Sequence, residues 1–203
     1  MSEGIGASVK RKEDKKFLTG KGRYTDDLNR PGQVHAHFVR SDVAHANIKS
    51  INTKAASTAA GVVAVYTGED IDVGGPICGW VVPNRDGSAT HEPPHPLLAK
   101  GKVRFVGDAV AVVIAESVDQ AKSASELVEV DYEELPAVAS LETAASGAEI
   151  HEGMAENRYF DWELGDEAAT DKALKSAAKV VKLKVRNNRL IPNAMEPRSA
   201  LAE

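Results

Sequence analysis

The sequence predicts a mixed α/β fold of the α+β class, in which short strands alternate with a few short helices. Two observations lead to this prediction. Apolar residues repeat with a period of two in several short segments, a pattern typical of strands with one buried face. Alanine-rich segments lie between the expected strands and begin after Ser, Thr or Asp, as helices do. Gly and Pro separate the expected strands and helices from one another. The chain of 203 residues is long enough to bury a substantial core.

The first third of the chain predicts an arm rich in turns, followed by regular structure. Residues 10–32 show neither a helical nor a strand period. After this arm, Val34, Ala36 and Phe38 alternate with His35, His37 and Val39, which predicts a strand with one buried face. The elements expected here are strands at 34–39, 48–52 and 62–66 and a helix at 54–60, with Thr53 as its cap and Gly61 as its end.

The middle of the chain predicts a long loop and then a compact run of elements. Residues 72–97 are rich in proline and glycine, and a loop of this length is usually functional, bound to a partner or mobile. The segment 109–132 predicts a unit similar to βαβ, in which Ser117 or Asp119 caps the helix. The expected elements are strands at 103–106, 109–115 and 128–132 and a helix at 118–127.

The last third predicts a connector and the start of a further domain. Residues 136–157 are rich in Ala, Ser, Gly and Glu and predict a connector with one helical turn near 141–145. Beyond it we expect strands at 158–164 and 179–186, a helix at 167–175 capped by Asp166, and a second strand beginning at Met195. Two strands and one helix cannot cover both faces of a sheet, so we expect this part to be incomplete.

Composition and charge exclude several classes of function. The 25 basic and 30 acidic side chains give a net charge of −5, which argues against general binding of nucleic acid or anionic membranes. No apolar run is long enough to cross a bilayer, and the first residues lack the pattern of a signal peptide. Cys78 is the single cysteine, so no disulfide framework or thiolate cluster is expected. A cytoplasmic location is the expectation that follows.

The histidines are candidate metal ligands. His35 and His37 lie two residues apart on an expected strand and share a face, and His45 is close enough in sequence to complete a site. The alternative, a solvated strand face, is favoured because exposed histidines are common. His91 and His95 are four residues apart, but the prolines between them exclude a helical metal pair, so these are interpreted as loop residues.

Other chemically interesting residues favour structural roles. Cys78 is a conceivable nucleophile, but no neighbouring base supports it, and an inert thiol is preferred. Trp80 is interpreted as an anchor of the 72–97 loop rather than a ligand contact. The glycines near 4–6 and 20–22 lack the flanking strand and helix of a dinucleotide loop. Three acidic pairs lie at element ends and predict caps and turns rather than an acid–base pair: Asp26–Asp27, Glu69–Asp70 and Glu133–Glu134.

Several segments, taken in order, resemble one family. They are residues 6–28, 39–51, 61–71, 102–117, 127–138 and 187–203, together with the AAKVVKL segment that follows a Gly–Asp pair. Each motif is weak evidence alone, but the motifs occur in the same order as in the family and together extend over nearly the whole chain. They resemble the large, molybdenum-binding subunit of the molybdenum hydroxylases, the relatives of carbon monoxide dehydrogenase, aldehyde oxidase and xanthine dehydrogenase. The N-terminal arm and the MEPR segment look closer to the carbon monoxide dehydrogenase branch.

The resemblance implies a domain organisation and a chemistry. It implies an N-terminal arm at 1–16, an a/b hammerhead domain at 17–137, a connector at 138–157 and, at 158–203, the incomplete start of a molybdopterin-binding domain. Enzymes of this family hydroxylate aldehydes or N-heterocycles with water as the oxygen source, or oxidise carbon monoxide. Their molybdopterin cytosine dinucleotide passes electrons through 2Fe-2S clusters to FAD. The implied partners are an iron–sulfur small subunit, an FAD-binding medium subunit and the rest of the large subunit, with no nucleic acid.

The resemblance places no catalytic, cofactor-binding or metal-binding residue on this sequence. The family's pterin-contacting loops and its catalytic glutamate are expected beyond residue 203. Glu196, in the NAMEPR segment, is interpreted as structural, and the context of Cys78 differs from that of the copper-linked cysteine. The 72–97 loop is expected to face the active-site funnel or a neighbouring subunit. We therefore expect no cofactor on this chain alone.

Three functional hypotheses follow. The first is the N-terminal portion of such an oxidoreductase, inactive alone because the catalytic centre lies elsewhere. The second is a non-enzymatic module that docks or assembles the other subunits. The third, a free-standing metal hydrolase that uses His35 and His37, is the least favoured.

Overall fold

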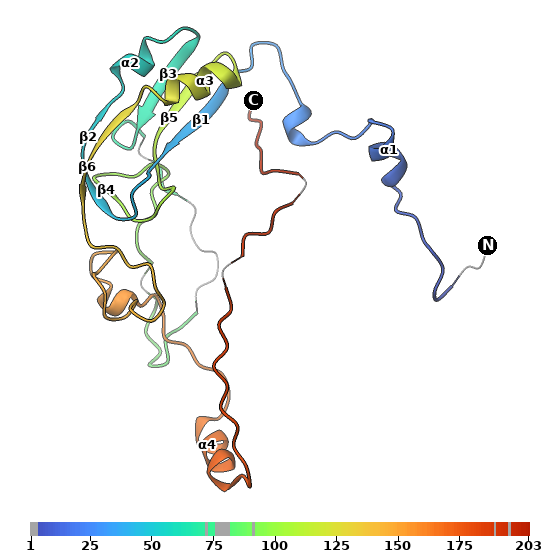
Figure 1. Ribbon diagram of the computed structural model, residues 1–203, viewed down its shortest axis with the longest axis vertical. Helices are drawn as coiled ribbons and strands as arrows, with labels where there is room; N and C mark the ends of the chain where they lie inside the picture. The colour runs from blue at the N-terminus through green and yellow to red at the C-terminus, as the bar shows by residue number, and fades with distance from the viewer. Residues whose placement is uncertain (1–3, 72, 76–81, 91, 189, 195) are drawn as a thin grey trace. The chain divides into compact units, whose positions relative to one another are not determined.

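The computed structural model describes residues 4–71, 73–75, 82–90, 92–188, 190–194 and 196–203. The chain divides into two compact units, one formed by residues 34–180 and the other by the two chain ends, 1–33 and 181–203. The larger unit contains two antiparallel sheets and three helices, which confirms the mixed α/β class (Figure 1). No helix within the described ranges is both long and apolar enough to cross a membrane.

The first sheet has the strand order β1–β5–β3 and is antiparallel throughout. Its strands are β1 (His35–Arg40), β5 (Ala109–Ala115) and β3 (Val62–Thr67). The central strand β5 contains only alanine, valine and isoleucine, and Val110 and Val113 have no exposed surface. A continuous apolar strand of this kind belongs at the centre of a sheet, because both of its faces are buried.

The second sheet has the order β4–β2–β6 and is also antiparallel. Its strands are β4 (Lys102–Val103), β2 (Ala46–Asn52) and β6 (Glu129–Glu134). In β6 the apolar Val130 and Tyr132 alternate with acidic residues, and these two residues face Ile51 and Ile48 of β2. The alternation places Val130 and Tyr132 on one, partly buried, face of the sheet and the acidic residues on the exposed face.

A small apolar core connects the two sheets. Its fully buried members come from β2, β4, β5 and the segment before β4: Ala46, Val103, Val110 and Ala99. Partly buried residues of β1, β2 and β6 pack around them, including Val39, Ile51 and Tyr132. The core residues are mostly alanine and valine, whose side chains are small. The strands therefore approach closely, and this close approach fills the space that bulky side chains fill in other cores.

Helices α2 (Lys54–Ser57) and α3 (Val118–Ser125) pack against the first sheet (Figure 1). Their buried residues are small alanines, Ala56 in α2 and Ala121 and Ala124 in α3. The Ser117 side chain accepts a hydrogen bond from the Gln120 N–H, which confirms the predicted cap of α3. Helix α4 (Glu167–Ser176) begins with the predicted Asp166 cap but buries no residue.

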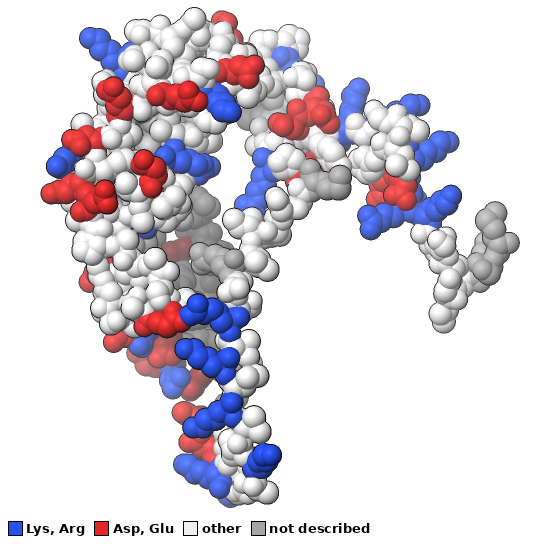
Figure 2. Space-filling model, viewed as in Figure 1, with Lys and Arg blue, Asp and Glu red and all other residues white. Residues whose placement is uncertain are grey.

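The unit formed by the chain ends contains a short helix that the sequence pattern did not predict. Helix α1 (Asp14–Leu18) has only five residues, too few to show a helical period. A 3₁₀ turn follows at Thr25–Asp27, and the rings of Phe17 and Tyr24 stack with centroids 5.7 Å apart. Figure 2 shows basic side chains gathered around α1, where the sequence contains Lys10, Arg11, Lys12, Lys15 and Lys16.

The buried face of β1 differs from the expected one. We expected Val34, Ala36 and Phe38 to be buried, but Phe38 is 37% exposed and Ala36 is exposed. His35 and His37 are instead half-buried and lie opposite Ala115 and Val113 of β5. Because α3 packs along β1 and β5, the covered face is decided by a helix about 80 residues away in sequence, which periodicity does not reveal.

The expected βαβ unit is wrong, because β5 and β6 belong to different sheets and neither pairs with the other. The strands expected at 158–164 and 179–186 do not form in the described chain. Val181, Leu183 and Val185 are each more than 75% exposed. A strand needs a neighbour that binds a row of its N–H and C=O groups. Within the described chain, another segment binds the backbone of 158–164 only at Asp161, through Asn84 and Arg85.

Smaller differences concern element ends. Strand β4 ends at Val103 and not at 106, and α2 ends at Ser57, three residues earlier than expected. Thr53 precedes α2 but makes no side-chain cap, and residues 141–145 form turns instead of a helical turn. The strand expected to begin at Met195 starts outside the described residues.

Candidate functional site

The described part of the 72–97 loop is bound to the segment that follows residue 157. The Arg85 N–H donates to the Asp161 carbonyl at 2.6 Å, and the Asp161 N–H donates to Asn84 Oδ1 at 2.9 Å. The Arg85 guanidinium lies 3.2 Å from a Glu163 carboxylate oxygen. Since both side chains are about half exposed, this ion pair contributes at most ~1 kcal/mol. The backbone bonds therefore hold the loop here.

The turn at 84–88 arises from its Asn-Arg-Asp-Gly-Ser sequence. Asn84 Nδ2 donates to Ser88 Oγ, and the Ser88 N–H donates to the Asp86 carboxylate at 2.9 Å. Hydrogen bonds from the Ser88 side chain and backbone lower the pKa of Asp86. Gly87 has a φ of +81°, a conformation that glycine adopts without strain. The turn is thus determined locally.

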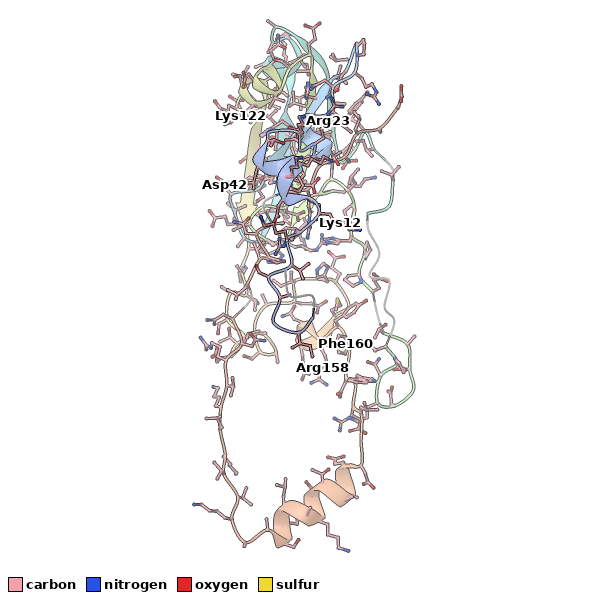
Figure 3. The ribbon with its side chains drawn as sticks, turned by 90° about the vertical axis from the view of Figure 1, so that its right-hand side faces the viewer. Lys12, Arg23, Asp42, Lys122, Arg158 and Phe160 are labelled. Atoms are coloured by element: carbon pink, nitrogen blue, oxygen red, sulfur yellow. The ribbon has the colours of Figure 1, made fainter. Side chains whose placement is uncertain are left out.

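A cavity of about 560 Å³ lies between this turn and residues 158–161. Arg158 and Phe160 line it (Figure 3), together with Arg85, Asp86 and Asp161. Its cations are already neutralised, because Arg158 pairs with Glu156 at 2.6 Å and Arg85 pairs with Asp161 and Glu163. The described residues that line the cavity include no Ser, Thr, Cys or Lys side chain, and it offers no evident catalytic chemistry.

The structure does not bring the candidate histidines together as a metal site. His35 and His37 lie on β1, whereas His45 precedes β2, is 5% exposed and shares a 2.8 Å hydrogen bond with the Pro136 carbonyl. Among the residues that the structure describes, no three His, Cys, Asp or Glu side chains are grouped to hold a metal ion. The His35–His37 face is half-buried, so the expectation of a solvated face is wrong.

The remaining candidate site residues either make contacts within the fold or lie outside the described residues. The His95 ring lies edge-on to Phe105, with centroids 6.4 Å apart. Three predicted residues, Cys78, Trp80 and His91, lie outside the described residues. Glu196 accepts a hydrogen bond from the Thr25 N–H at 3.5 Å, within the unit formed by the chain ends.

In two of the three acidic pairs one member binds a donor at a turn, which agrees with the prediction of caps and turns. Asp27 accepts a hydrogen bond from the Tyr24 N–H, and Asp70 accepts hydrogen bonds from the Thr67 N–H and hydroxyl. These bonds lower the pKa of Asp70, with the backbone bond as the largest cause. The third pair differs, because Glu133 lies within β6 and binds across the sheet. Glu133 accepts a hydrogen bond from Asn47 on the neighbouring strand β2.

Sequence reasoning missed a second cluster around Arg104 and His151. Burial lowers the pKa of His151, and the positive charge of Arg104 lowers it further. Asn157 fixes this region, because Nδ2 donates to the Ala144 and Ala148 carbonyls and Oδ1 accepts from the Ile150 N–H. No local motif indicates the cluster, since its members come from segments almost 50 residues apart.

The residues that line the larger cavity do not fit a molybdopterin group. Such a group carries phosphate, which proteins bind with unpaired cations or with rows of backbone N–H groups at glycine-rich turns. The arginines of the larger cavity are paired with carboxylates, and its loop N–H groups bind carbonyl and carboxylate oxygens. No step of a molybdenum reaction can therefore be assigned to these residues.

Residues 19–136 match the family described as aldehyde oxidase and xanthine dehydrogenase, a/b hammerhead domain. Over 199 residues the chain is 36% identical to the nicotine 6-hydroxylase large subunit of Paenarthrobacter nicotinovorans, covering 98% of this chain and 24% of that protein. It is 37% identical to the carbon monoxide dehydrogenase large chain of Afipia carboxidovorans, covering 96% of this chain and 25% of that protein.

Solved structures are similar to the chain in the same way, over a part of a longer protein. The reconstituted CO dehydrogenase from Oligotropha carboxidovorans superposes with a TM-score of 0.68 and 36% identity, covering 87% of this chain and 23% of that one. Quinoline 2-oxidoreductase from Pseudomonas putida 86 gives a TM-score of 0.59 and 42% identity, covering 71% and 18%. The chain thus spans about a quarter of the length of the curated relatives it matches.

Proposed function

The chain belongs to the aldehyde oxidase and xanthine dehydrogenase family, and from this premise we propose that it serves as the N-terminal portion of the large subunit of a molybdopterin-dependent oxidoreductase. The observation that carries this proposal is the match over residues 19–136, together with 36–37% identity to two large subunits over nearly the whole chain. Relatives named molybdenum-binding subunits support molybdenum as the metal of the intact enzyme.

Within this proposal each part of the chain has a role. Residues 17–137 form the hammerhead domain, 1–16 an arm and 138–157 a connector, while 158–203 begin the region that binds molybdopterin. The reaction class is hydroxylation of an aldehyde or N-heterocycle with oxygen from water, or oxidation of carbon monoxide. The cofactor is the cytosine dinucleotide form, and 2Fe-2S clusters and FAD on small and medium subunits receive the electrons. The enzyme acts in the cytoplasm.

The catalytic centre of the proposed enzyme is formed by polypeptide outside residues 1–203. Support comes from the donor groups described above, which are paired with protein partners, and from the share of each relative that the chain covers. The chain then contributes a folded domain and surfaces for the rest of the subunit, while molybdenum supplies the redox chemistry elsewhere.

Co-expression tests the proposal. The chain, produced alone in cells supplied with molybdate, should contain far less than one molybdenum atom per molecule by mass spectrometry. Co-expression with the remainder of a related large subunit and its two partner subunits should give substrate-dependent dye reduction. Stoichiometric molybdenum or pterin on the chain alone would contradict the assignment of the centre to other polypeptide.

A second candidate function is a non-enzymatic docking module, in which the exposed apolar residues at 181–191 contact a partner subunit. Leu183, Leu190 and Ile191 are each more than 80% exposed. A docking module should be monodisperse alone and should capture a flavin- or iron–sulfur-containing subunit without the remainder of the large subunit. The nucleotide sequence beyond codon 203 separates the two candidates, since an in-frame continuation with glycine-rich loops favours the enzyme.

A further inference from the structure

A second cavity, of about 350 Å³, lies within the unit of residues 34–180. It is formed by the loop after β4, the chain after β6 and residues 150–157. Apolar side chains form most of its wall, among them Phe105, Val138, Ile150 and Met154. Its volume falls at the lower end of the range for sites that hold a small organic molecule.

Arg104 is the charged group of this cavity. Its Nε–H donates to the Ile150 carbonyl at 3.2 Å, which orients the guanidinium, and its backbone N–H donates to the Asp108 carboxylate at 3.1 Å. No side-chain ion pair involves Arg104 within the described chain, in contrast to Arg85 and Arg158 of the larger cavity. The outer nitrogens of Arg104 can therefore donate to an incoming acceptor.

Two histidines near the cavity add polar groups to its surroundings. His151 lines the wall, and its burial and the neighbouring Arg104 favour its neutral form. His45 lies behind the wall, because its neighbour Ala44 lines the cavity and its hydrogen-bond partner Pro136 precedes the lining residue Ala137. The Nε2 atom of His45 is buried and has no hydrogen-bond partner among the described residues. A buried polar atom of this kind normally has a hydrogen-bond partner, such as an ordered water.

We propose that this cavity binds a small organic monocarboxylate, with the carboxylate on the Arg104 guanidinium and the apolar body against Phe105, Ile150 and Met154. A guanidinium without a protein counter-ion recognises a carboxylate in a fork geometry, and the apolar wall selects acids with a hydrocarbon body over inorganic anions. The site goes beyond the proposed oxidoreductase function and does not depend on molybdenum, since all of its residues belong to the described chain.

Titration of the 203-residue chain with benzoate, followed by amide NMR, tests the site. Saturable shifts should concentrate at residues 104–106, 137–139 and 150–157. Benzamide has the same ring but no charge, and it should bind about tenfold more weakly or worse, because charge-assisted hydrogen bonds are the stronger kind. Equal binding of both compounds, or no saturable binding of benzoate, would overturn the proposal.

Three variants locate the carboxylate. Arg104→Gln should weaken benzoate binding about tenfold, and Arg104→Lys should give an intermediate loss, because the charge remains but the guanidinium fork is removed. Lys122→Gln removes the same charge from the exposed face of α3 (Figure 3), where no residue lines the cavity, and should leave binding unchanged. Unchanged melting temperatures confirm that the variants are folded. If Arg104→Gln bound benzoate as well as the parent chain does, Arg104 would not be the carboxylate partner.

Discussion

Ser117 and Asp166 show how single side chains begin the helices of this protein. The Ser117 Oγ accepts the Gln120 N–H at 3.3 Å, and Asp166 accepts the Ala169 N–H at 2.8 Å. Both residues were predicted as caps because Ser and Asp satisfy N–H groups that the first helical turn leaves free. Local chemistry of this kind can be read from a few neighbouring residues.

Replacing Ser117 by alanine should lower the free energy of unfolding by about 1 kcal/mol, because the Gln120 N–H loses its acceptor. Urea unfolding followed by circular dichroism measures the change. Ser123→Ala is the matched control, since Ser123 is exposed within α3 and alanine is a better helix former. Equal destabilisation by both substitutions would show that the cap is not the cause.

Asp70 should titrate below the ordinary range for aspartate, because the Thr67 N–H and hydroxyl stabilise its charged form. A lowered folded-state pKa gives stability that is present above the unfolded pKa and is lost as the pH falls through the folded value. Carboxyl NMR titration measures this pKa directly. Thr67→Val removes the hydroxyl but keeps the N–H, so the pKa should rise only part of the way, and an unchanged value would exclude the hydroxyl as a cause.

The Asn157 side chain binds three backbone groups between residues 144 and 150, and the residue has a φ of +51°, which asparagine tolerates better than most residues. Asn157→Ala should destabilise the chain by about 2–3 kcal/mol, because three partly buried hydrogen bonds are lost. Amide exchange should accelerate between residues 144 and 157. The exposed Asn187 provides the control, and its replacement by alanine should leave both measurements unchanged.

At the scale of elements, strand β5 organises the first sheet. Its composition predicts burial on both faces, and it pairs with β1 on one side and β3 on the other. The sequence did not show that the next helix leads to a different sheet. The local pattern is compatible with a return to the same sheet and with a crossing to the other sheet. Which of the two connections forms depends on the sheet edge that each strand reaches in the folded chain.

The end of β3 approaches the segment before β4 closely at Gly68. A Cβ atom at this position would lie 2.5 Å from the Ala99 carbonyl oxygen, in the buried segment that also contacts the core. Gly68→Ala should therefore destabilise the chain by about 1–3 kcal/mol, because backbone must move. Gly74→Ala serves as the control, since its Cβ meets no atom within 4 Å. Thermal unfolding compares the two, and equal melting temperatures would refute the close approach.

At the scale of the whole molecule, the exposed apolar residues at 181–185 indicate a surface that another polypeptide covers. If the chain is the N-terminal portion of the oxidoreductase subunit, it should self-associate when produced alone. Leu183→Thr with Val185→Thr should weaken this association about tenfold or more, because apolar surface is removed. Light scattering coupled to size exclusion measures it. Lys182→Thr with Lys184→Thr replaces two exposed polar side chains of the same segment as a control. Association that persists in the first variant would show that other residues drive it.

The sequence by itself determined the mixed α/β class, the positions of most strands, two helix caps and the family. The strand positions and the helix caps depend on interactions between residues that are near neighbours in the chain. The family is indicated by motifs in a fixed order, and both kinds of information are present in the sequence. The tertiary structure decided which face of β1 is covered, how the strands divide between two sheets, and that Arg104 and His151 share a cavity. Each of these depends on segments distant in sequence, and their proximity arises only when the core forms.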